Sequence, residues 1–119
     1  MIVNYTKERI ANVLNGTTVE VPSYFMIGSG SGTALATQTT LITPTDRQLM
    51  TSRSGTSTYK VMWQGDWNNT EMSGLSLREF GLTISGTGTT GSMWSRTTLP
   101  TITFDGSMEL QIQEQWEVF

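Results

Sequence analysis

The sequence predicts a mainly β protein: an antiparallel two-sheet β-sandwich, jelly-roll-like, with one short N-terminal α-helix. Thr, Ser and Gly occupy 45 of the 119 positions, and 21 of these are Thr, a β-branched residue that favours pleated, partly exposed surfaces. Five to seven segments have the length and pattern of strands, and turn residues separate them. The length is that of one domain, which divides into a helical arm at 1–16 and a sandwich at 19–119.

The helix is expected at the start of the chain. Thr6 or Asn4 can cap its first turn, and Asn15 with Gly16 can form a left-handed C-terminal cap. A helix of about ten residues is too short to be stable in isolation, so its apolar face must dock against the sheet or against a neighbouring chain. That face consists of Ile10, Val13 and Leu14.

The first half of the sandwich is expected to hold three strands. Residues 23–27 form an apolar run, and the following Gly-Ser-Gly-Ser-Gly at 28–32 predicts a loop or a close approach of another backbone. Residues 47–54 are a weaker candidate. From 57 to 67 apolar and polar residues alternate, which is typical of a half-buried strand, and a polar turn is expected at 68–71.

Three more strands are expected in the second half. In the segment 75–84 the apolar residues change parity, which predicts a bulge near 78–81 or burial of both faces. The glycine-rich segment 86–91 predicts a hairpin tip before a strand at 92–99 that Pro100 ends. The last strand, 108–118, alternates clearly, and only Glu114 interrupts its apolar face.

Composition excludes several classes of function. The sequence contains no Cys and no His, which removes disulfides, thiolate and imidazole metal ligands, and Ser/His or Cys/His catalysis. The net charge of -3 offers no basic surface for nucleic acid. No apolar run reaches about 18 residues, and no basic-then-apolar leader is seen, so neither a membrane span nor a secretion signal is expected. No cofactor or metal is predicted.

Two carboxylates occupy positions where the strand pattern favours an inward residue. These are Glu79 and Glu114. A buried carboxylate needs a partner, and Arg78, Arg96 or Arg47 can supply one. A structural ion pair or an intersubunit contact is favoured over a catalytic pair of acids, although a glycosidase would use such a pair.

The tryptophans have three possible roles. Trp63 and Trp67 share their strand parity with Val61, as expected of residues that fill a sandwich core. Anchoring an interface and stacking on a sugar are the alternatives. Trp94 and Trp67 are the candidates for a glycan contact.

Four blocks of the chain, at 9–16, 22–30, 71–82 and 93–100, together resemble a family of small virion structural proteins of tailed bacteriophages. In the second block, Met26-Ile27-Gly28-Ser29-Gly30 is similar to the family's stretch of methionine or alanine, isoleucine, glycine, a small residue and glycine. The resemblance extends over nearly the whole chain. It implies a role in virion assembly, as a tail-associated, tail-fibre or capsid-surface protein, and it implies no catalytic residues.

The expected function is therefore that of a non-enzymatic virion subunit, assembled in the host cytoplasm, which binds copies of itself and other virion proteins. A trimer or hexamer is expected, because such subunits pack in symmetric arrays. The alternative is a carbohydrate-binding module that recognises a host surface glycan, and an enzyme using carboxylates is the third possibility. The candidate interface residues are Tyr5, Arg9, Ile10, Val13, Gly30, Arg78 and Glu79.

Overall fold

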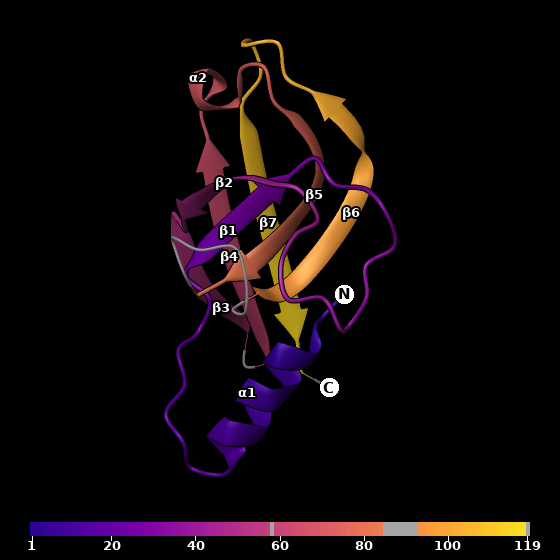
Figure 1. The fold of residues 1–119 in the computed structure, drawn as a ribbon. Helices are drawn as coiled ribbons and strands as arrows, with labels where there is room; N and C mark the ends of the chain where they lie inside the picture. Colours follow the sequence, from indigo (N-terminus) through magenta and orange to yellow (C-terminus); the bar gives the residue numbers. More distant parts are fainter. Residues whose placement is uncertain (58, 85–92, 119) are drawn as a thin grey trace.

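A computed structural model describes residues 1–57, 59–84 and 93–118, and within them two antiparallel sheets pack face to face (Figure 1). This confirms the predicted β-sandwich with a short N-terminal helix. Sheet A has the strand order β2-β1-β5-β6, and sheet B has the order β3-β4-β7. The elements are α1 (Asn4–Leu14), β1 (Tyr24–Gly28), β2 (Pro44–Leu49), β3 (Ser52–Ser57), β4 (Lys60–Trp67), α2 (Asn69–Met72), β5 (Ser76–Thr83), β6 (Met93–Thr103) and β7 (Leu110–Glu117).

Sheet B follows the alternation read from the sequence. β4 lies between β3 and β7 and turns Trp63, Gly65 and Trp67 toward sheet A, where all three are buried. Gly65 is required by close packing, because a Cβ there would lie 2.6 Å from the ring of Phe25. The main core fills the space between the sheets; its members include Phe25, Ile27, Trp63, Trp67, Leu82 and Ile112.

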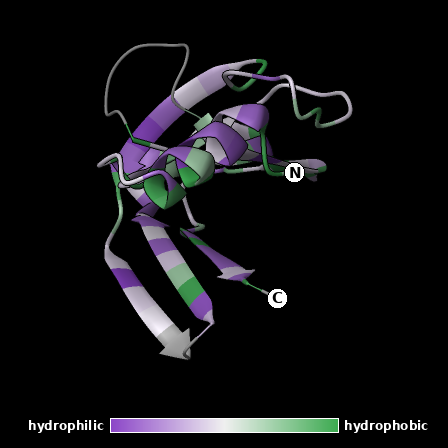
Figure 2. Ribbon diagram, turned by 90° about the horizontal axis from the view of Figure 1, so that it is seen from below, coloured by the Kyte–Doolittle hydropathy of each residue, from purple (hydrophilic) through white to green (hydrophobic). Residues whose placement is uncertain are grey.

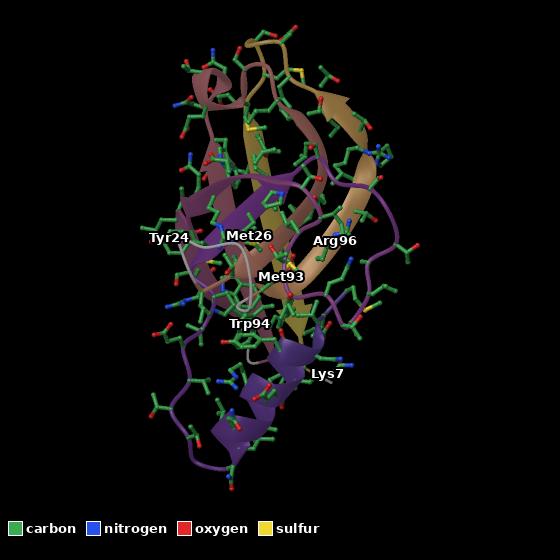
Figure 3. The ribbon with its side chains drawn as sticks, in the orientation of Figure 1. Lys7, Tyr24, Met26, Met93, Trp94 and Arg96 are labelled. Carbon is green, nitrogen blue, oxygen red and sulfur yellow. The ribbon has the colours of Figure 1, made fainter. Side chains whose placement is uncertain are left out.

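Sheet A is covered on its other face by the start of the chain and by the segment 33–43. The residues before α1 run beside β6: the Val3 amide donates to the Trp94 carbonyl at 3.2 Å, and Ile2 forms an antiparallel bridge with Ser95. A second buried cluster forms beneath these segments, and Figure 3 shows two of its methionines. The cluster consists of Val3, Met26, Leu41 and Met93.

α1 ends as predicted but begins differently. Gly16 has φ 84° directly after the helix, which confirms the left-handed C-terminal cap. Neither Thr6 nor Asn4 caps the first turn, because Asn4 is already helical and Val3 holds the N-cap position without a side-chain hydrogen bond. The Thr6 hydroxyl instead donates to the Trp94 carbonyl at 2.6 Å, which fastens the helix to β6.

Several predicted boundaries change in the structure. The candidate at 47–54 is two strands, β2 in sheet A and β3 in sheet B, and the turn at 68–71 contains the short helix α2, capped by Asn68. β6 continues through Pro100 to Thr103. A proline is tolerated in an edge strand because its nitrogen, which has no hydrogen to donate, can face away from the neighbouring strand. Of the two predictions for β5, burial of both faces is the one observed, since the consecutive residues Gly81, Leu82 and Thr83 are all buried. The register with β6 does shift between Leu77 and Glu79, but the paired residue moves from Ile102 to Thr98, so the extra residues lie on β6. The expected hairpin tip at 86–91 lies outside the described residues.

Candidate interaction surface

A buried ion pair joins β5 to β6. Glu79 and Arg96 are both fully buried, and Arg96 Nε donates to Glu79 Oε1 at 2.9 Å. This confirms the prediction that an inward Glu79 requires an arginine, and it selects Arg96 among the three candidates. Two oppositely charged groups without contact to water hold each other in the ionised state.

The carboxylate also holds the segment that covers sheet A. Glu79 Oε2 accepts from the amides of Gly30 and Thr43, both at 2.8 Å, and Oε1 accepts from the Ile42 amide at 2.9 Å. Burial raises the pKa of Glu79, but these backbone donors and Arg96 outweigh it, so the pKa lies below its usual range. All of this hydrogen-bonding capacity is used inside the fold.

These contacts correct two predicted interface residues. Gly30 and Glu79 are buried and contact each other, so neither is available to a neighbouring chain. For Glu79 the error follows from strand geometry, because successive residues point to opposite faces. Arg78 is exposed and remains a candidate.

Replacing Gly30 with Ala is expected to lower the free energy of unfolding by about 1–3 kcal/mol. The new Cβ would lie 2.3 Å from Glu79 Oε2 and 2.5 Å from the Ile42 Cβ, so the loop would have to leave the carboxylate. Urea denaturation of both chains measures the effect. Ser31→Ala, at the exposed next position, is the matched control, and an unchanged midpoint for Gly30→Ala would contradict the role given to this glycine.

Glu114 is the second inward carboxylate, and its partners are not arginines. Burial raises its pKa, and the hydrogen bonds from Trp116 Nε1 at 2.7 Å and Ser95 Oγ at 2.9 Å offset this only in part. The group therefore lies between the sheets as a structural link.

The two tryptophans proposed as glycan contacts are core residues. Trp67 and Trp94 are only 1% and 6% exposed. Trp67 Nε1 donates to Asp46 Oδ2 at 2.9 Å, which links sheet B to β2, and Trp94 packs against Tyr5 and Trp116. Neither indole presents a face to solvent, so the core interpretation holds and the glycan assignment of these two residues is corrected.

The first turn of α1 rests on sheet A, and the rest of the helix leaves the sandwich. Tyr5 meets the Trp94 ring edge-on with centroids 6.5 Å apart, and the Arg9 guanidinium lies 4.9 Å from the centroid of the Tyr5 ring. Beyond this point Figure 1 shows α1 extending past the strands, and Figure 2 shows hydrophobic positions along it. The exposed fractions of its apolar residues are 48% for Ile10, 51% for Val13 and 84% for Leu14.

We call this surface the helix face and define it by Ile10, Val13 and Leu14. The structure thus presents Ile10 and Val13 to solvent, as predicted for interface residues. Tyr5 and Arg9 are half-buried and orient the helix rather than extending the helix face.

A second apolar surface was not predicted from the sequence. β6 and β7 are the last strands of sheets A and B, and a groove of about 290 Å³ lies between them. Leu99 and Leu110 are half-buried in it, and Ile102 is 36% exposed. The expectation that Pro100 ends the strand concealed the part of β6 beyond it. The groove, named the edge groove here, is lined by Leu77, Phe80, Leu99, Ile102, Leu110, Gln111, Ile112 and Gln113.

The described residues hold no group of three or more side chains arranged to bind a metal ion. Within the same residues, no helix has the length and hydrophobicity needed to cross a membrane.

Comparison of the chain with protein family models, with curated proteins and with solved structures finds no match.

Proposed function

We propose that this chain is a non-enzymatic structural subunit of a bacteriophage virion, which assembles with itself and with neighbouring virion proteins as a tail- or fibre-associated or capsid-decorating protein. The observation that carries the proposal is the helix face. Ile10, Val13 and Leu14 project into solvent from a helix of 11 residues, and burying such residues is the main driving force for protein association.

The chemistry of the buried charged groups supports a structural role. Glu79 accepts hydrogen bonds from the amides of Gly30, Ile42 and Thr43. Arg96 donates to the Gly32 carbonyl and to Gln38 Oε1. Glu114 links the sheets through Ser95 and Trp116. Groups with perturbed pKa values are often catalytic, but here each is directed at the fold itself.

The carbohydrate-binding alternative is less well supported by the geometry. Its two candidate residues, Trp67 and Trp94, are in the core. Assembly is therefore the function that the exposed surface supports best, and a ring of three or six copies is the form that we propose for it.

The proposal predicts that phage particles contain the chain and that the helix face is needed for its incorporation. In phage carrying Ile10→Ser, Val13→Ser and Leu14→Ser together, the copy number per particle is expected to fall at least about tenfold, because the loss of apolar burial weakens association. Quantitative mass spectrometry of purified particles measures it. Leu49→Ser is the matched control, since Leu49 is 60% exposed on β2. Particles that lack the wild-type chain would overturn the proposal.

A further inference from the structure

Two apolar surfaces lie at opposite ends of the molecule. The helix face is on α1, beyond one end of the sheets, whereas the edge groove is near the connection from β6 to β7 at the other end (Figure 1). The molecule is 47 Å long. Because of this separation, α1 cannot fill the groove of its own chain, and a neighbouring molecule is needed to cover both surfaces.

The two surfaces match in chemistry. A helix that presents apolar residues at positions i, i+3 and i+4 is the usual ligand of an apolar groove, and Ile10, Val13 and Leu14 have this spacing. The edge groove offers aliphatic side chains from β5, β6 and β7 along its floor and rim. Its polar lining residues are the uncharged amides Gln111 and Gln113, so an apolar helix would not bury a charge against it.

The charges at the two ends are also complementary. Lys7 is exposed and lies one turn before Ile10, on the same side of α1 as the helix face. At the other end, Glu109 is exposed directly before Leu110, and it lines a depression together with Asp66. When the helix face of one copy approaches the edge groove of another, Lys7 therefore meets carboxylates. This favours pairing a helix end with a groove end over pairing two helix ends or two groove ends.

We propose that α1 of one copy docks in the edge groove of the next copy, head to tail, with Lys7 directed at Glu109. This inference rests on the self-assembly in the proposed function and names its contact. Because the two surfaces differ, the contact is heterologous, and repeating it produces a ring when the rotation closes. Each copy then has its helix face and its edge groove covered.

Two single substitutions, one in each surface, test the contact. The oligomeric state of the full-chain variants is measured by analytical ultracentrifugation. Val13→Asp damages the helix face and Ile102→Asp damages the edge groove, and each variant is expected to be monomeric where the wild-type chain is oligomeric. Mixing the two is expected to give a 1:1 dimer and nothing larger, because only one intact helix face and one intact groove remain. Circular dichroism melting curves check that both variants fold.

A charge exchange tests the register of the contact. Lys7→Glu and Glu109→Lys are each expected to weaken association about tenfold, and the double variant is expected to recover most of this loss. Both side chains are exposed, so folding is retained. Glu20→Lys, at an exposed position in the connection after α1, is the control and leaves association unchanged.

Three results would overturn the inference. These are oligomers that survive Ile102→Asp, a mixture of the two defective variants that stays monomeric, and a wild-type chain that is monomeric at every concentration. The first two leave the proposed function standing, whereas a wild-type chain that is always monomeric would also remove its self-assembly. The presence of the chain in purified particles is measured separately by mass spectrometry.

Discussion

Replacing Glu79 with Gln lowers the free energy of unfolding by about 3–5 kcal/mol, as expected when one member of a buried ion pair is removed. The glutamine side chain carries no charge, so the Arg96 guanidinium loses its counter-charge. The side-chain NH2 group is also a donor, so it cannot accept the hydrogen bonds that backbone amides donate to the carboxylate. Those donors are the amides of Gly30, Ile42 and Thr43. Urea denaturation at neutral pH measures the loss.

Two further variants separate the parts of this effect. Arg78→Gln changes the exposed neighbour and is expected to shift stability by less than about 0.5 kcal/mol. Arg96→Met is expected to cost less than Glu79→Gln, because the carboxylate keeps its three backbone donors. A Glu79→Gln chain as stable as the wild type would contradict the central place given to this residue.

The same group makes stability depend on pH. The pKa of Glu79 is lower in the folded chain than in the unfolded chain, so the unfolded state binds a proton first as the pH falls. The contribution of Glu79 to stability is fully present when the pH is above the ordinary glutamate pKa of about 4.3. It is lost as the pH falls from that value through the lower pKa of the folded state. The Glu79→Gln chain is expected to show a shallower loss of stability over this acidic range.

Replacing Trp67 with Ala lowers the free energy of unfolding by about 3–5 kcal/mol. The side chain is 1% exposed, and its removal leaves a cavity between the sheets and leaves Asp46 without the indole donor. Thermal and urea unfolding of the two chains measures the loss. Tyr59→Ala is the matched control, since Tyr59 precedes the same strand and is 66% exposed, and its effect is expected to stay within about 0.5 kcal/mol.

The outcome also separates the two sequence interpretations of this tryptophan. A glycan-stacking residue could be removed with the fold intact, whereas a core residue cannot. A Trp67→Ala chain with wild-type stability would contradict the packing described here and would return the carbohydrate-binding function to consideration.

Most strands could be predicted because one physical rule acts on each of them. Alternation in β4 and β7 indicates one exposed face and one buried face, and the change of parity in β5 indicates a strand that is covered on both faces. The change of sheet between β2 and β3 had no such signal, since Met50 and Thr51 differ little in character from the residues around them. The sheet that each strand joins is decided by its pairing partner, which lies in another segment of the sequence. A local sequence pattern therefore does not reveal it.

The candidate site was predicted only in part, for a related reason. The exposure of Ile10 and Val13 follows from the shortness of α1 and its single apolar face. The burial of Gly30 depends on Glu79, which lies 49 residues later in the chain, and the loop composition alone suggested a peripheral segment. The edge groove arises where the last strands of two sheets meet, which no single segment of the sequence indicates.

α1 is anchored at its first turn, and the chain is fixed to the sandwich again at Pro22. Before it, Val3 is buried against β6, and after it the connection returns to a buried Pro22 whose carbonyl accepts from Arg53. The helix is therefore part of a segment that is attached to the sandwich before and after it, and it is not a free terminal tail. Much of the orientational freedom that a flexible segment would lose on docking has already been given up during folding, so a partner meets a ligand that is preorganised.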